Sequence, residues 1–124
     1  MSNAANATNA TAKIILHGVK LSGHSNRAEL MLNLPGLDYE FRGLDLAAGA
    51  QRQPGFLRRN PFGAVPVIED GDIVVTDSVA ILVYPALKYD ADRVWFPTDP
   101  GAAAQVQRWL FVAQGNIING PCKA

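Results

Sequence analysis

The 124-residue sequence has one cysteine and two histidines, and this scarcity restricts its chemistry. One cysteine cannot form an internal disulfide, and so few Cys and His side chains argue against a multi-ligand zinc site. No Cys-x-x-Cys pair occurs, which excludes dithiol redox catalysis. We therefore expect neither a bound metal nor a resident cofactor.

The sequence also lacks an excess of charge of either sign and any long apolar run. Eleven Lys and Arg balance eleven Asp and Glu, without a basic cluster, which argues against nucleic-acid or anionic-membrane partners. No apolar run approaches the roughly 18 residues of a membrane span. The length allows one sizeable core. We expect a soluble, cytoplasmic globular domain.

The ends of the chain differ from its middle. Residues 1–12 are low in complexity and uncharged, which predicts a disordered tail rather than a signal peptide. Residues 13–90 are expected to form the main domain and residues 91–100 a linker. A last helix is predicted from Asp99-Pro100 to about residue 119, within a final segment 101–124.

Apolar periodicity and turn residues predict the elements of the main domain. Strands are expected over residues 13–18, 37–46, 65–69 and 73–75, the last two joined by a turn at Asp70-Gly71. Helices are expected over residues 22–34, as a short turn at 56–59 after a loop at 47–55, and from Asp77 to about 87. The β-α-β-α-β-β-α order indicates an α/β, thioredoxin-like fold with a mixed four-stranded sheet, followed by a further helix.

The strongest local signal is Asn-Pro-Phe-Gly-Ala-Val-Pro-Val at residues 60–67. A cis bond between Val65 and Pro66 would turn the Val65 backbone outward, where an extended peptide could pair with it. The alternative is a trans proline at a strand edge. Since only about 5–6% of X–Pro bonds in folded proteins are cis, the residues alone favour the trans form.

Two helix starts carry polar side chains that could bind a ligand. Ser78, at the start of a helix, could hold a carboxylate together with unpaired backbone N–H groups, and Asp77 could receive an ammonium. Ser22 could donate a hydrogen bond to a thiolate and so lower the pKa of the thiol. The alternative for Asp77, Ser22 and Ser25 is a simple helix cap, and which serine lies nearer a thiol stays open.

These signals occur in an order that resembles a known family. From about Lys13 to Tyr89 the chain resembles the N-terminal domain of soluble glutathione S-transferases, most closely the phi class and its bacterial relatives. The matching stretches are HGVKLSGHSNRAELML, LDYEFRGLDL, QPGFLRRNPFGAVPVIEDGDIVV and TDSVAILVY. That family uses a cis proline, a helix-start serine and a first-helix hydroxyl together. The resemblance therefore implies a cis bond at Pro66 and ligand-binding roles, rather than simple caps, for Ser78 and Ser22.

The resemblance implies a role for each of these residues in binding glutathione. Ser22 would be the catalytic serine that stabilises the glutathione thiolate. Val65, before the cis Pro66, would pair its backbone with the cysteinyl part, and Asp77 with Ser78 would hold the γ-glutamyl end.

Several positions depart from the family pattern, among them Asp77, which replaces the commoner glutamate and has a shorter reach. The family's usual His-Lys pair, which meets the glycyl carboxylate, is replaced by Gln51-Arg52, where Arg52 keeps the cation. The glutamine that often precedes the Val-Pro is replaced by Ala64.

The resemblance further implies the activity and the assembly. A serine at position 22 suggests activation of glutathione, as co-substrate, for conjugation to a small electrophile or reduction of a peroxide. The alternative is a non-catalytic glutathione-binding or protein-interaction module. A third possibility, thiol–disulfide exchange, would need a cysteine at position 22, where this chain has a serine.

The full-length family form is expected to be a homodimer with an all-helical second domain, of which only the first helix, about 101–119, is present. This truncation predicts an exposed stripe of Val106, Trp109 and Leu110, and hence poor solubility or association.

Overall fold

Four strands form one mixed sheet in the order β2-β1-β3-β4. The computed structural model describes residues 13–121, so the expected disordered tail at 1–12 lies outside the described residues. The strands are β1 (Ile14–Gly18), β2 (Tyr39–Gly43), β3 (Val67–Asp70) and β4 (Ile73–Thr76). Strand β1 runs parallel to β2, whereas β3 is antiparallel to both β1 and β4. The expected thioredoxin-like sheet is therefore present.

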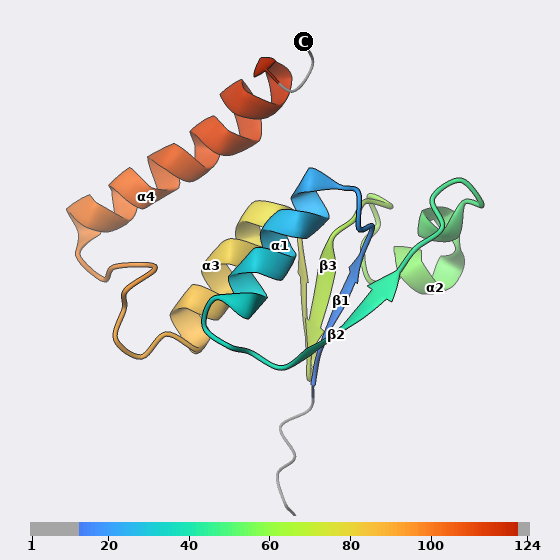
Figure 1. Cartoon of the computed structure of the whole chain (residues 1–124), viewed down its shortest axis with the longest axis horizontal. Helices are drawn as coiled ribbons and strands as arrows, with labels where there is room; N and C mark the ends of the chain where they lie inside the picture. Colours follow the sequence, from blue (N-terminus) through green and yellow to red (C-terminus); the bar gives the residue numbers. More distant parts are fainter. Residues whose placement is uncertain (1–12, 122–124) are drawn as a thin grey trace, which may run out of the picture.

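Helices cover both faces of this sheet, as Figure 1 shows. Helices α1 (Gly23–Asn33) and α3 (Ser78–Lys88) lie on one face, and the short α2 (Pro54–Leu57) lies on the other. A single 3₁₀ turn, η1 (Ala50–Arg52), precedes α2. Helix α4 (Pro100–Val112) continues into a π-helical turn, η2 (Ala113–Ile117), and lies outside the α1–α3 layer, on the side away from the sheet (Figure 1).

Several boundaries differ from those that the sequence predicts. The strand expected over 65–69 begins only at Val67, because Pro66 cannot donate to the ladder. The short helix begins at Pro54 rather than residue 56, with the proline in its first turn, and η1 occupies part of the expected loop. The hairpin turn consists of Gly71 and Asp72, one residue later than expected, with Gly71 at a φ of 59°.

The core lies between the sheet and the α1–α3 layer. Alternate residues of β1, Ile14 and Leu16, point into it and meet Ile68 of β3. The remaining buried members come from α1 and α3: Ala28, Leu32 and Ile81. Each buried large aliphatic side chain contributes about 1.5–3 kcal/mol, so this cluster holds α1 and α3 against the sheet.

The opposite face of β1 carries a buried polar cluster beneath α2. The His17 Nε2 atom lies 2.6 Å from a Glu69 carboxylate oxygen, and its ring meets the edge of Phe56. Arg59 pairs with the other oxygen of Glu69 at 3.0 Å. Burial opposes the ionisation of Glu69, but the hydrogen bonds from His17 and Arg59 outweigh it and hold the pKa of this carboxyl below its ordinary value. His17 thus joins α2 to the sheet.

Helix α4 turns part of its expected exposed stripe inward. Val106 and Leu110 are half-buried and line a small apolar cavity of about 160 Å³ with side chains of α1, α3 and the connecting segment. Only Trp109, of the three expected residues, is exposed, at 59%, and Phe111 beside it is 73% exposed. The expected exposure is therefore wrong for Val106 and Leu110, because the apolar flank of α3 offers them a contact surface. No helix within residues 13–121 is long and apolar enough to cross a membrane.

A buried carboxylate ties the end of β3 to the end of α3. One oxygen of Asp70, Oδ2, accepts hydrogen bonds from Tyr84 at 2.8 Å, Lys88 at 2.7 Å and Tyr89 at 2.6 Å. Burial alone would raise the pKa of Asp70, but these hydrogen bonds, the one from Lys88 foremost, hold the pKa below its ordinary value. The ionised carboxylate is therefore the stabilising form.

We expect Asp70→Asn to lower the free energy of unfolding by about 1–3 kcal/mol at neutral pH, because three donors lose a charged acceptor. A carboxyl with a lowered pKa in the folded state stabilises the protein above its unfolded pKa, and the contribution is lost as pH falls through the folded pKa. The difference between wild type and variant should thus shrink as the pH falls below the ordinary aspartate pKa of about 3.9. Urea unfolding of wild type and variant at neutral pH and at a pH below that value measures the difference in unfolding free energy. A difference that does not depend on pH would contradict this account.

Candidate functional site

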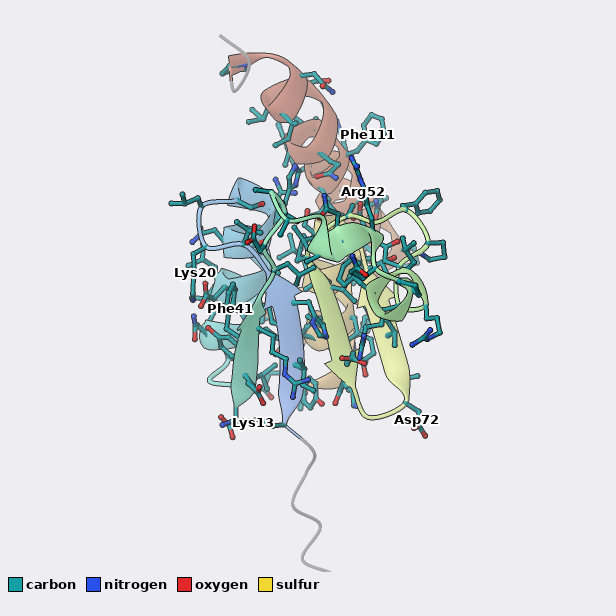
Figure 2. All side chains as sticks on the ribbon, turned by 90° about the vertical axis from the view of Figure 1, so that its right-hand side faces the viewer. Lys13, Lys20, Phe41, Arg52, Asp72 and Phe111 are labelled. Carbon is teal, nitrogen blue, oxygen red and sulfur yellow. The ribbon has the colours of Figure 1, made fainter. Side chains whose placement is uncertain are left out.

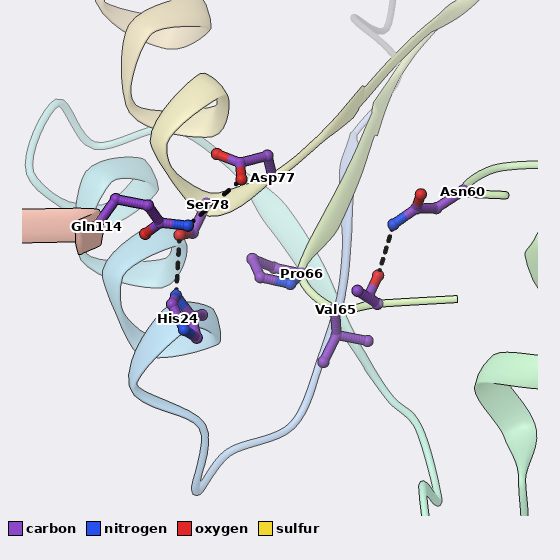
Figure 3. A pocket seen from close by; sticks show the side chains of 8 residues that line it. His24, Asn60, Val65, Pro66, Asp77, Ser78 and Gln114 are labelled. Atoms are coloured by element: carbon purple, nitrogen blue, oxygen red, sulfur yellow. Dashed lines mark hydrogen bonds between the residues drawn. The ribbon is translucent and has the colours of Figure 1, made fainter. Parts of the chain in front are cut away.

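Residues far apart in the sequence meet at one polar cleft of about 190 Å³ beside the start of β3. The lining residues come from the start of α1, the loop before β3, the start of α3 and the turn after α4, as Figure 3 shows. They are His24, Asn60, Ala64, Val65, Pro66, Asp77, Ser78 and Gln114. Four of the residues predicted from the sequence, Val65, Pro66, Asp77 and Ser78, are therefore brought together.

The loop before β3 presents free backbone groups to this cleft. The peptide bond between Val65 and Pro66 is cis, which confirms the conformation that the family resemblance implies and not the trans form that the residues alone favour. Among residues 13–121, no hydrogen bond uses the N–H or C=O of Val65. An extended peptide could therefore pair with this backbone as an added strand.

Asn60 holds this loop in shape. It is buried, its side-chain N–H donates to the Ala64 carbonyl at 2.9 Å, and its Oδ1 accepts from the Phe62 N–H at 3.1 Å. The sequence analysis placed Asn60 at the start of its strongest local signal, residues 60–67, and assigned its side chain no role. Asn side chains commonly bond to nearby backbone groups in turns, and this tendency could have indicated the role of Asn60.

Asp77 caps α3 and also faces the cleft. Its Oδ1 accepts from the Val79 and Ala80 N–H groups at 2.8 and 3.3 Å, while Oδ2 lies 3.4 Å from the Gln114 side-chain nitrogen. Its φ of 73° is rare for a residue other than glycine and costs about 1–3 kcal/mol. Such strain occurs most often at functional sites, and here it leaves one carboxylate oxygen directed away from the helix.

Ser78 opens α3 and is buried against two side chains of α1. Its Oγ accepts a hydrogen bond from Arg27 at 3.1 Å and lies 3.2 Å from Nδ1 of His24. With a His24 proton on Nδ1, the Ser78 Oγ accepts from both side chains and its own proton stays available to a ligand. The hydroxyl and the guanidinium together suit a carboxylate, whereas the Val79 and Ala80 N–H groups of the helix start are already bound by Asp77.

The sequence analysis did not single out Arg27. His24 and Arg27 are three residues apart on one face of α1, and this spacing places both opposite the start of α3. The sequence shows that these two residues share a helix face. It does not show that this face contacts Ser78, because the packing of α1 on α3 depends on the tertiary fold.

Ser22 and Ser25 have different surroundings at the start of α1. Ser22 is the N-cap, and its half-buried Oγ accepts from the Ser25 N–H at 3.3 Å, which leaves the hydroxyl proton available to a ligand. Ser25 is only 1% exposed, and its Oγ accepts from the Val19 N–H at 3.0 Å. Ser25 therefore closes the β1–α1 turn, and Ser22 is the better candidate to face a thiol. Ser22 itself is outside the set of residues that line the cleft.

Gln51 and Arg52 lie in η1, outside the residues that line the cleft. The Gln51 carbonyl would be 3.1 Å from a Cβ at Gly63, so η1 touches the loop before β3. The buried Gln51 Oε1 has no hydrogen-bond partner among residues 13–121. Arg52 is exposed and has no ion pair with another described residue; Figure 2 shows it at the surface. Their role in binding a carboxylate stays a prediction.

The cleft can therefore recognise an extended peptide with a free amino-acid end. Its Asp77 oxygen suits an ammonium, the Ser78–Arg27 corner suits a carboxylate, and the Val65 backbone suits a peptide unit. Within residues 13–121, no group of three or more His, Cys, Asp or Glu side chains could hold a metal ion.

Comparisons with known proteins point to one family. A family model described as glutathione S-transferase, N-terminal domain, matches residues 13–86. Over 101 residues the chain is 41% identical to glutathione S-transferase 3 of Zea mays, covering 82% of this chain and 46% of that protein. It is 41% identical over 109 residues to glutathione S-transferase 1 of Dianthus caryophyllus, which covers 87% of this chain and 46% of that protein.

A solved structure supports the same likeness. The structure of a glutathione transferase homologue from Drosophila mojavensis with bound glutathione superposes with a TM-score of 0.79 at 32% identity. This match covers 83% of the present chain and 47% of that one. The chain thus spans about half the length of the relatives that it matches.

Proposed function

Because the chain belongs to the glutathione S-transferase N-terminal domain family, we propose that its cleft binds glutathione and activates the glutathione thiol. The observation that carries this proposal is the free Val65 backbone beside the Asp77–Ser78 helix start. Glutathione is an extended tripeptide with an amino-acid end, and these groups match its two recognisable parts. The bound glutathione in the structure from Drosophila mojavensis is consistent with this.

Each part of glutathione has a proposed partner in the cleft. The γ-glutamyl ammonium pairs with Oδ2 of Asp77, and the γ-glutamyl carboxylate accepts from the Ser78 hydroxyl and from Arg27. The cysteinyl unit pairs with the Val65 backbone before the cis Pro66, and the glycyl carboxylate extends toward Gln51 and Arg52. This orientation directs the thiol toward the start of α1.

Ser22 then acts on the thiol. Its hydroxyl donates to the thiolate, and the start of α1 adds a partial positive charge, so the thiol pKa falls. The thiolate is the nucleophile: it displaces a leaving group from an electrophile, or adds to it with uptake of a proton. On a peroxide it attacks one oxygen, the O–O bond breaks and an alcohol leaves, and a second glutathione converts the resulting sulfenic acid to the disulfide and water. A serine has no sulfur with which to form a mixed disulfide, so conjugation or peroxide reduction is favoured over thiol–disulfide exchange.

The wider setting is proposed on the family resemblance. We propose a small electrophilic co-substrate, a homodimer for the full-length form and a cytoplasmic location. The zero formal net charge and the absence of a basic cluster in the sequence agree with a partner that is neither nucleic acid nor membrane.

Isothermal titration of the chain with glutathione tests the proposal. We expect binding that is lost with cysteinylglycine, because this dipeptide lacks the γ-glutamyl end and leaves Asp77 and Ser78 without partners. Ser78→Ala should weaken glutathione binding about tenfold, since one hydrogen bond to a charged group is lost. Equal affinity for the two ligands would contradict the assigned orientation, and binding without a lowered thiol pKa would favour the non-catalytic binding module.

A further inference from the structure

The side chain of Gln114 lies across the part of the cleft assigned to the amino-acid end of the ligand. Its Oε1 accepts a hydrogen bond from Arg27 Nη1 at 2.8 Å, and its Nε2 donates to Asp77 Oδ2 at 3.4 Å. Figure 3 shows Gln114 reaching from the chain after α4 to Asp77 and Ser78. Among residues 100–121, Gln114 alone lines this cleft.

The Gln114 amide has the same polarity as an amino-acid head group. A carboxamide carries an acceptor and a donor on one carbon, as a zwitterionic amino acid carries a carboxylate and an ammonium nearby. The acceptor meets the guanidinium of Arg27, and the donor meets the carboxylate of Asp77. The opposite amide orientation would set donor against donor and acceptor against acceptor, so the partners fix the assignment.

The backbone at Gln114 is irregular as well. Helix α4 ends at Val112, and Gln114 is the second residue of the π-helical turn η2. Such wider turns are rare and occur frequently at functional sites. Gln114 is half-buried, so part of the residue is already exposed to solvent.

We propose that Gln114 is an internal occupant of the amino-acid subsite, which a γ-glutamyl ligand must displace in order to bind. This inference rests on the proposed function. Arg27 and Asp77 are engaged by Gln114 in the free protein, so the apparent affinity is reduced by the fraction of molecules in which the amide has left. Gln114 thereby lowers the affinity of the cleft for a γ-glutamyl ligand. Because Gln114 follows α4, binding of that ligand is also coupled to the position of α4.

Titration of Gln114→Ala with glutathione, γ-glutamylcysteine and cysteinylglycine tests this inference. We expect about tenfold tighter binding of the two γ-glutamyl ligands, because two competing hydrogen bonds are gone, and no gain for cysteinylglycine. Gln114→Met keeps the length of the side chain without its hydrogen bonds and should show a similar gain. Gln105→Ala is the matched control, since Gln105 is exposed on α4 and makes no side-chain hydrogen bond within residues 13–121.

The outcomes separate the two proposals. Wild-type binding that Gln114→Ala leaves unchanged or weakens would overturn the occupant and leave the proposed function standing. An equal gain in Gln105→Ala, or a gain in the alanine but not the methionine variant, would likewise overturn displacement of a hydrogen-bonded amide. If neither wild type nor Gln114→Ala binds glutathione, the proposed function fails, and the occupant with it. Binding only by the Gln114 variants would support the occupant most strongly.

Discussion

Asparagine in place of Asp77 is expected to weaken glutathione binding by about ten- to a hundredfold. The substitution removes the negative charge that faces the γ-glutamyl ammonium, and a hydrogen bond to a charged group contributes about 1.5–3 kcal/mol. Asparagine keeps an oxygen that can accept from the Val79 and Ala80 N–H groups, so the cap of α3 persists. It also tolerates a positive φ better than most residues do.

Asp72→Asn is the matched control for this loss. Asp72 is exposed in the β3–β4 turn, and Figure 2 shows it at the far end of the sheet. The control makes the same change of net charge away from the cleft. Calorimetry on both variants should show a loss only for Asp77→Asn, and equal affinities would contradict an ion pair between Asp77 and the ligand. Thermal melts of both variants check that the fold is kept.

Loss of the Ser22 hydroxyl is expected to raise the pKa of the bound glutathione thiol by about one to two units. The reason is that the thiolate loses a hydrogen-bond donor, which contributes about 1.5–3 kcal/mol when one partner is charged. The pH dependence of thiolate ultraviolet absorbance in the complex measures the shift. The proposed conjugation near neutral pH should slow in proportion to the lost thiolate.

Two variants separate this effect from the helix cap. Ser22→Ala removes both the hydroxyl and the hydrogen bond from the Ser25 N–H and should destabilise the fold by about 0.5–2 kcal/mol. Ser22→Gly removes the hydroxyl but costs only a few tenths of a kcal/mol as a cap. The two variants should share the raised thiol pKa while differing in stability. A thiol pKa that neither variant changes would remove Ser22 from the mechanism.

The strands of the sheet were predictable because apolar runs and turn residues mark them within a few positions of the sequence. The apolar run at β1 and the turn after Asp70 identified strands, although the turn itself lies one residue later. Asp77 was recognised as a cap since the capping bonds reach only to Val79 and Ala80. The cis bond at Pro66 was different: the residues alone favoured trans, and only the order of several motifs indicated the conformation that the structure has.

The contacts that cross between elements were not predictable in this way. Arg27 and Gln114 are 87 positions apart, and no periodicity shows that α4 returns over the start of α1. The direction of the α4 stripe was misjudged for the same reason, because the apolar flank of α3 that receives Val106 and Leu110 exists only in the folded chain. Where Gln51 and Arg52 lie relative to the cleft likewise depends on how η1 packs.

The most direct test of glutathione binding at this cleft is a two-dimensional amide NMR spectrum of the chain with and without reduced glutathione. The account predicts a dispersed spectrum in which the peaks of Ser22, Val65 and Ser78 shift on addition of the ligand, while that of Asp72 at the far end does not. A dispersed spectrum in which glutathione moves none of these peaks, or moves them no more than that of Asp72, would contradict it.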